Sequence, residues 1–124
     1  LGFVVIELLG EWNDTLYNDI MYLKRDVIDP FIKKGITKFA LNGENVLNYH
    51  SSDDSYYEEW FQDIEQGWIA GLNFRDFVLT EFLNSGIGNY ILFNPKDEEF
   101  NWRIMSPVQV SQKIDDFLNK RLGY

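Results

Sequence analysis

The chain has 124 residues, of which 45% are hydrophobic and 17% aromatic, and its formal net charge is −9. These values predict one folded domain over residues 1–124, and the acidic balance argues against a nucleic-acid partner, because such binding depends on Lys and Arg. With no cysteine and no apolar run of about 18 residues, the sequence excludes disulfides, cysteine-bound metals and a membrane partner, and we expect a cytoplasmic protein.

The first part of the chain predicts a strand followed by a helix. Residues 3–9 form a run of β-branched and leucine side chains that ends at Gly10, which is typical of a buried strand. Apolar residues then recur at helical spacing over residues 16–31, and this pattern predicts a helix. Asn13 or Asp14 is the expected N-cap, because both residue types accept hydrogen bonds from the first N–H groups of a helix.

A second strand and a second helix are predicted next, with a polar segment between them. Residues 36–41 are predicted to form the strand, and residues 42–54 are rich in Asn, Gly, Ser, His and Asp, which indicates a loop. Within that loop Val46 and Leu47 are expected to reach the core. The helix is predicted to begin near Asp54, and its buried face is expected to contain Tyr57, Trp60, Phe61 and Ile64.

The second half of the chain predicts two more strands and two more helices. Residues 68–72 and 89–93 have the composition of strands, and residues 77–83 have helical spacing. Ser106, followed by a proline and then by Gln109, has the pattern of a capping box and predicts the start of the last helix. The buried face of that helix is expected to contain Val110, Ile114, Phe117 and Leu118.

Strands and helices that alternate in this way predict a single α/β domain with a mostly parallel sheet of four to five strands and about four helices. Residues 102–105 are either an edge strand or irregular. In a parallel sheet the carboxyl ends of the strands share one rim, where ligands commonly bind. The polar residues expected at this rim are Glu11, Asn13, Asp14, Asn42, Glu44, Asn45, Asn73, Arg75 and Asn94.

The rim residues have two interpretations. Glu11, Asp14 and Glu44 are suitable ligands for Mg²⁺ or Ca²⁺, since both ions take carboxylate oxygens. Asn and Asp are equally typical of helix caps and of turns after strands, and this structural interpretation is the preferred one. We therefore expect no metal site, while a ligand site at the rim stays open as an alternative.

His50 is the single histidine of the chain, and it stands in the predicted loop with Ser51, Ser52, Asp53 and Asp54. These residue types suggest a Ser-His-Asp triad, but triad members come from separate elements, and neighbours on one short loop do not usually align as a relay. A solvated histidine beside a helix cap is the preferred interpretation. No glycine-rich phosphate-binding pattern is present, so we expect no cofactor and no catalytic residue.

Four segments of the chain follow, in order, the pattern of a known family. They are residues 5–14 with the sequence VIELLGEWND, residues 38–53 with KFAL, VL and HSSD, residues 69–87 with IAGL and LNSGI, and residues 106–118. The order of elements resembles the STAS domain, the fold of anti-sigma factor antagonists and of the cytoplasmic tails of sulfate transporters. The phosphorylatable serine of the family falls on Ser51, although His50 stands where the family has Asp and Asp53 where it has Gly.

The resemblance implies a small regulatory module that binds a protein partner and catalyses no reaction. The residues implied in partner binding or phosphorylation are His50, Ser51, Ser52, Asp53, Asp54 and Tyr56. A phosphoserine adds a charge of about −1.5 to −2, which a helix N-terminus accommodates. Two alternatives stay open: an interaction protein of an uncharacterised family, and a small enzyme or metabolite- or metal-binding protein that uses the rim residues Glu11, Asn13, Asp14, Glu44, Asn45 and Arg75.

Overall fold

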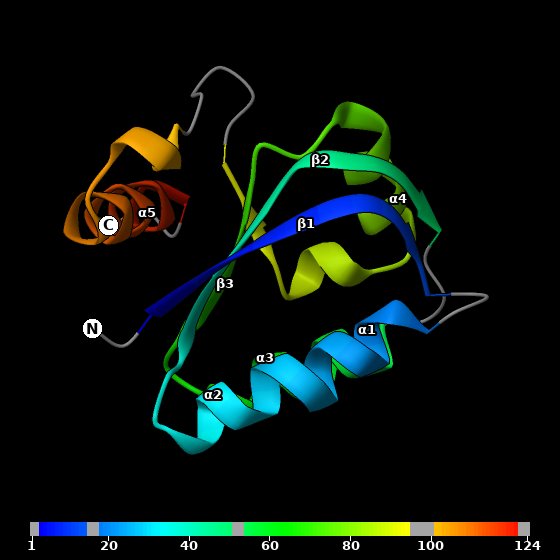
Figure 1. Ribbon diagram of the computed structural model, residues 1–124, viewed down its shortest axis with the longest axis horizontal. Helices are drawn as coiled ribbons and strands as arrows, with labels where there is room; N and C mark the ends of the chain where they lie inside the picture. Colours follow the sequence, from blue (N-terminus) through cyan, green and yellow to red (C-terminus); the bar gives the residue numbers. More distant parts are fainter. Residues whose placement is uncertain (1–2, 15–17, 51–53, 95–100, 122–124) are drawn as a thin grey trace.

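The computed structural model describes residues 3–14, 18–50, 54–94 and 101–121, which form an α/β fold (Figure 1). Its sheet has four strands in the order β1 to β4, and all neighbouring strands are parallel. The strands are β1 (Phe3–Asn13), β2 (Lys38–His50), β3 (Trp68–Leu72) and β4 (Leu92–Phe93). The predicted parallel sheet is confirmed, whereas residues 102–104 form a short 3₁₀ helix and not an edge strand.

The described helices cover both faces of the sheet (Figure 1). On one face lie α1 (Asp19–Tyr22), the π-helical η1 (Leu23–Ile28) and α2 (Asp29–Lys33), which continue into one another, then α3 (Ser55–Asp63), α4 (Asp76–Asn84) and the 3₁₀ helix η2 (Ile87–Asn89). On the other face lies α5 (Pro107–Arg121), which follows the 3₁₀ helix η3 (Trp102–Ile104). None of the helices in the described ranges is long and apolar enough to cross a membrane.

The larger core lies between the sheet and the helices α1 to α4. Trp60 is 0% exposed, and its ring meets Phe39 edge to face with the ring centroids 5.5 Å apart. Tyr57 is buried on the same side of α3, as predicted. Phe61 is 42% exposed, so its predicted burial is wrong, because adjacent helical residues point about 100° apart. Its ring lies against Tyr90 instead, with the centroids 5.6 Å apart.

The smaller core lies under α5, and both sequence predictions for this helix are confirmed. Ser106 donates its N–H to Gln109 Oε1 at 2.9 Å, and Gln109 donates its N–H to Ser106 Oγ at 3.2 Å, which completes the capping box. The buried side chains are the predicted Val110, Ile114, Phe117 and Leu118, which pack on Ala40, Trp68, Ala70 and Leu72 of the sheet.

The first two strands are longer than predicted. β1 passes through Gly10 to Asn13, and β2 includes residues 42–50, which were expected to be a loop. Gly10 has a φ of +83°, and the register between β1 and β2 shifts twice nearby, so β-bulges absorb the irregular residues. Because successive side chains of a strand point to opposite faces, Val46 is 1% exposed as predicted but Leu47 is 60% exposed.

The first helix begins later than the predicted caps allow. It starts at Asp19, after Asn18 in a left-handed conformation with φ of 53°. Neither Asn13 nor Asp14 is the N-cap, because the extension of β1 keeps this part of the chain in the sheet. Asp14 nevertheless accepts the N–H of Ile20 at 2.8 Å, so it binds the helix N-terminus from the end of the strand.

Candidate functional site

The carboxyl ends of β1 and β2 and the beginning of α3 lie at one end of the molecule, away from the N-terminus (Figure 1). Asn13 pairs with His50 in the register of the two strands, and the N–H of Asp14 donates to the carbonyl of His50 at 2.8 Å. α3 begins at Ser55. The predicted loop residues Ser51, Ser52 and Asp53 lie outside the described residues, and His50 and Asp54 flank them.

The surface at the start of α3 is acidic and partly aromatic. The hydroxyl of Tyr90 donates to carboxylate oxygens of Asp54 and Glu58 at 3.4 and 3.2 Å. Partial desolvation, together with the negative charges of these two groups, raises the pKa of Tyr90. His50 is exposed at the end of β2, and Phe61 is exposed in part beside Tyr90. The described flanks of residues 51–53 therefore present carboxylates, an imidazole and aromatic rings.

Two neighbouring tyrosines near the start of α3 lie in different environments. Tyr56 is half-buried, and its ring lies beneath the guanidinium of Arg25 at 5.4 Å from the centroid. Tyr57 is 2% exposed and points into the core. The sequence placed Tyr57 on the buried face of the predicted helix. Tyr56 therefore stays at the edge of the acidic surface, while Tyr57 joins a buried polar group.

This buried polar group, the Asp14 node, consists of Asp14, Tyr49 and Tyr57. Asp14 is 3% exposed and its Oδ2 accepts the hydroxyls of Tyr57 at 2.8 Å and Tyr49 at 3.2 Å. The two hydroxyl oxygens lie 2.6 Å apart. Since Asp14 Oδ1 also accepts the N–H of Ile20, one carboxylate connects the ends of β1 and β2 with α1 and α3.

Burial dominates the electrostatics of the Asp14 node. It raises the pKa of Asp14, although the hydrogen bonds from Tyr57 and Ile20 favour the charged form. Burial also raises the pKa of Tyr49 and of Tyr57 well above that of free tyrosine, and the nearby Asp14 acts in the same direction. Both hydroxyls therefore keep their protons. Asp14 Oδ2 and the two tyrosine hydroxyl oxygens make three close contacts with one another. While Asp14 is ionised, only the two hydroxyl protons are available, so only two of these contacts can be hydrogen bonds at one time.

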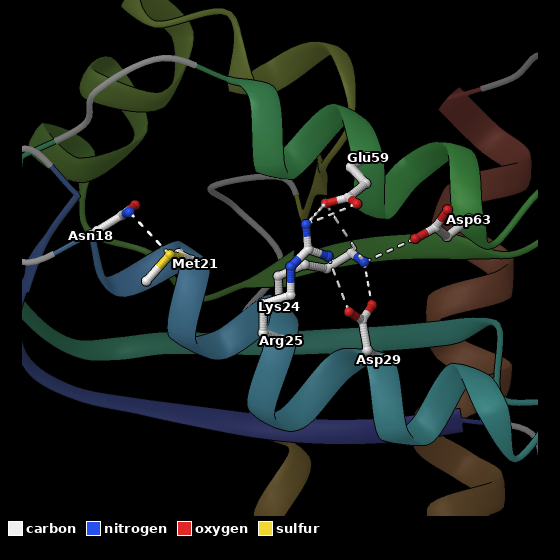
Figure 2. Close-up of polar contacts among 7 residues, drawn as sticks. All are labelled: Asn18, Met21, Lys24, Arg25, Asp29, Glu59 and Asp63. Atoms are coloured by element: carbon white, nitrogen blue, oxygen red, sulfur yellow. Dashed lines mark hydrogen bonds and ion pairs between the residues drawn. The ribbon is translucent and has the colours of Figure 1, made fainter.

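A second polar group, the Lys24 cluster, joins η1 and α2 to α3 (Figure 2). It consists of Lys24, Arg25, Asp29, Glu59 and Asp63. The Lys24 side chain is 0% exposed and its Nζ lies 2.9 Å from Asp63 Oδ2 and in contact with Asp29 Oδ1. Arg25 pairs with Asp29 at 3.1 Å and with Glu59 at 2.9 Å. The cluster therefore holds the second half of α3 against η1 and α2.

The charges of the Lys24 cluster stabilise one another. Burial lowers the pKa of Lys24, but hydrogen bonds to Asp29 and Asp63 outweigh it and the pKa is raised overall. Burial opposes ionisation of Asp29 too, and the bonds from Lys24 and Arg25 prevail, so that its pKa is lowered. Sequence analysis did not identify this cluster, because Lys24 and Asp63 are 39 residues apart and meet only when the helices pack.

The predicted rim residues separate into two places. Asn42, which is 0% exposed, accepts Asn73 Nδ2 at 3.3 Å and donates to Glu44 Oε1 at 3.2 Å. Asn94 Oδ1 accepts the N–H of Asn73 at 2.9 Å, and Arg75 Nε donates to the carbonyl of Glu44 at 3.2 Å. The carboxyl ends of β3 and β4 and the middle of β2 thus share one chain of hydrogen bonds, as expected for a rim.

The remaining rim residues lie on β1 or just after it. Glu11 is exposed on β1, Asp14 is buried in its node, and Asn13 donates its N–H to Asp19 Oδ2 at 2.7 Å. The carboxylates of Glu11, Asp14 and Glu44 therefore have separate surroundings, because β1 and β2 extend beyond their predicted ends. Among the described residues no three His, Asp or Glu side chains form a group that could hold a metal ion.

Arg103 is a contributor to the rim that sequence analysis did not identify. It comes from η3 and its guanidinium pairs with Glu7 of β1 and Glu44 of β2. Asn45 Nδ2 donates to the same Glu7 at 3.1 Å. Arg103 follows Glu7 by 96 residues, so no local sequence pattern predicts the contact between them. The hydrogen bond from Arg103 is the largest of the factors that lower the pKa of Glu44.

The fold of this chain is similar to that of solved proteins of low sequence identity. No family model matches the sequence, and no curated protein matches it significantly. The anti-sigma factor antagonist SpoIIAA in its unphosphorylated form superimposes with a TM-score of 0.59 at 22% identity, over 77% of this chain and 82% of that chain. The chain has the STAS fold. The resemblance predicted from four sequence segments is therefore confirmed for the fold.

SpoIIAA also matches in a second state. The structure of this Bacillus cell fate determinant in the phosphorylated form superimposes with a TM-score of 0.53 at 19% identity, over 77% of this chain and 86% of that chain. Both superpositions show a shared fold. Of the predicted partner-binding residues that the structure describes, His50 ends β2, Asp54 directly precedes α3 and Tyr56 lies in its first turn.

Proposed function

We propose that this protein is a small regulatory module that binds a protein partner through the surface at the start of α3 and catalyses no reaction. The observation that carries the proposal is the fold shared with SpoIIAA, which is an anti-sigma factor antagonist. A cytoplasmic location belongs to the same proposal. The residues proposed to contact the partner are His50, Ser51, Ser52, Asp53, Asp54 and Tyr56.

The chemistry of the described flanks supports a basic partner. Asp54 and Glu58 place two carboxylates beside the hydroxyl of Tyr90, and Phe61 adds a partly exposed ring. Complementary charge steers association and selects partners, so a patch of Lys or Arg on the partner fits this surface. The Asp14 node lies beneath it and joins β1, β2 and α3 by buried hydrogen bonds. These hydrogen bonds therefore hold the start of α3 against the ends of β1 and β2.

Phosphorylation is a proposed regulator of this contact. SpoIIAA has been solved in phosphorylated and unphosphorylated forms. The family resemblance of the sequence implies that the phosphorylatable serine of this chain is Ser51. A phosphate would add a charge of about −1.5 to −2 beside Asp53 and Asp54. The helix N-terminus of α3 favours that charge, and the two neighbouring carboxylates oppose it. We expect phosphorylation to change the affinity for the partner more than it changes the fold.

Charge reversal tests the proposal directly. Asp53→Lys with Asp54→Lys should weaken capture of a specific partner from lysate of the source cells, measured by quantitative mass spectrometry against the unmodified chain. The matched control is Asp115→Lys with Asp116→Lys, which changes the charge equally on α5, across the sheet from α3. Capture should be unchanged in this control.

Two results would contradict the proposal. One is an undiminished set of captured proteins after the change at Asp53 and Asp54, with the fold verified by circular dichroism. The other is a metal-dependent hydrolase activity that is lost in Glu11→Gln or Glu44→Gln, which would move the function to the rim.

A further inference from the structure

A second exposed surface lies on the opposite side of the sheet, where α5 leaves part of it uncovered. Phe3 and Val5 of β1 pack into the smaller core under α5. Figure 1 shows α5 beside the N-terminal end of β1, while the carboxyl-terminal parts of β1 and β2 extend away from it. Farther along β1 on the same face, Glu7 binds Arg103, and Leu9 beyond it is exposed.

Two leucines are exposed next to each other on this uncovered part. Leu9 is 71% exposed and Leu47 is 60% exposed. Their neighbours Leu8 and Val46 are buried in the larger core, so both leucines point to the α5 side. Leu9 pairs with Asn45 in the register, and Leu47 lies two residues farther along β2. The leucines are therefore neighbours on adjacent strands and form one apolar patch.

The carboxylate of Glu11 borders these leucines. Glu11 is exposed, and its neighbour Trp12 packs on the larger core, so Glu11 also points to the α5 side. It forms no ion pair with any residue in the described ranges. We define the outer-face patch as Leu9, Glu11, Asn45 and Leu47. It combines an apolar centre with a negative edge.

We propose that the outer-face patch binds a segment of a partner protein in which apolar side chains alternate with Lys or Arg. The apolar side chains would cover Leu9 and Leu47, and a basic side chain would pair with Glu11. Charge excludes the other occupants: a second copy of this chain, with a net charge of −9, would bring the same carboxylates against the patch, and anionic lipid would be repelled. This surface is independent of the one at the start of α3.

A peptide titration followed by NMR tests this inference. The probe is a synthetic peptide of alternating Leu and Lys, added to the ¹⁵N-labelled chain at physiological salt. The amide signals of Leu9, Glu11 and Leu47 should shift. The acidic start of α3 also attracts Lys, so any shift there should be the same with a peptide of alternating Ser and Lys. Two control peptides of the same length, one of alternating Ser and Lys and one of alternating Leu and Glu, should bind at least about tenfold more weakly. The first lacks apolar side chains, and the second lacks positive charge.

Two variants and a control complete the test. Leu9→Ser with Leu47→Ser should lower the affinity for the peptide of alternating Leu and Lys about tenfold. Glu11→Lys, which keeps both leucines, should also lower this affinity. Leu83→Ser is the matched control, because Leu83 is 69% exposed on α4 and lies outside the patch.

The inference is overturned by equal binding of the Ser and Lys peptide, by unchanged affinity in both patch variants, or by shifts confined to α3. A chain that elutes as a dimer through this patch would also overturn it.

Discussion

The Asp14 node and the Lys24 cluster both hold α3, one near each end of the helix, but they do so by different physics. The three members of the node are 2% to 6% exposed, so their energy depends on hydrogen bonds that water cannot replace. In the Lys24 cluster the lysine is buried, but its carboxylate partners are 27% to 43% exposed. Water and salt therefore screen the cluster far more than the node. The Asp14 node and the Lys24 cluster are therefore expected to contribute different free energies to the stability of α3, although both are polar.

The largest effect is expected at Trp60, which lies on α3 between the two polar groups. Trp60→Ala removes a fully buried ring and should lower the free energy of unfolding by about 3 to 5 kcal/mol. Urea unfolding measures this loss. Phe61→Ala is the control on the adjacent, partly exposed position and should cost about 1 kcal/mol or less. Equal losses in the two variants would contradict the assigned buried face.

Within the node, Tyr57→Phe is expected to have the next largest effect. The ring keeps its edge-to-face packing on Phe82, but Asp14 loses a hydrogen bond of 2.8 Å, and the loss should be about 1.5 to 3 kcal/mol. Tyr49→Phe, whose bond to Asp14 is longer at 3.2 Å, should cost less. Both losses should persist in about 1 M NaCl, since the node is buried. A loss that disappears with salt would place the node in contact with solvent.

The pH dependence of stability tests the charge of Asp14. Because its pKa is raised in the folded state, the folded protein holds this proton where the unfolded chain has released it. The contribution of Asp14 is therefore fully present below its unfolded pKa of about 3.9 and is lost as pH rises through the folded value. Asp14→Asn should remove this pH-dependent loss of stability, because the amide of Asn has no charge and can donate to a tyrosine hydroxyl at every pH.

The measurement is urea unfolding of both proteins from about pH 4 to pH 7. The stability of Asp14→Asn relative to the unmodified chain should increase with pH across this range. A constant difference would show that Asp14 has the same pKa in both states.

The smallest effect is expected in the Lys24 cluster. Arg25→Gln removes exposed ion pairs to Asp29 and Glu59 while Lys24 continues to bind Asp29. The small loss of stability at low salt should vanish in about 1 M NaCl, where the screening length is about 3 Å. Thermal unfolding at two salt concentrations measures it, with Tyr57→Phe as the salt-independent reference. A loss that is insensitive to salt would mean that Arg25 acts through its packing on Tyr56.

Much of the fold was predictable, because several of its signals are local. The residues 68–72 were assigned as a strand with the bounds that the structure has for β3. The capping box at Ser106 positioned α5, since its two hydrogen bonds join residues three positions apart. Glycine and asparagine predicted a loop at residues 42–50, and this prediction is wrong because pairing with β1 keeps these polar residues in a strand. Strand ends depend on a partner strand that no local pattern describes.

The candidate site was predictable only as a segment. Its position between a strand and the second helix followed from the loop composition and from the family resemblance, and β2 and α3 border that segment. The acidic surface of Asp54 and Glu58 around Tyr90 was not predicted, because Tyr90 lies more than 30 residues away along the chain. Residue types near the site were therefore known from the sequence, and their grouping was not.

The sequence by itself determined the start and the buried face of α5, since these depend on neighbours within one or two turns of chain. Only the tertiary structure decided that Asp14 is a buried node, because it meets Tyr49 and Tyr57 across 35 and 43 residues. The same holds for Lys24, whose burial is favourable only when the carboxylates of α3 lie beside it. Polar side chains acquire their roles from partners that packing brings together, because their interactions are short in range and directional.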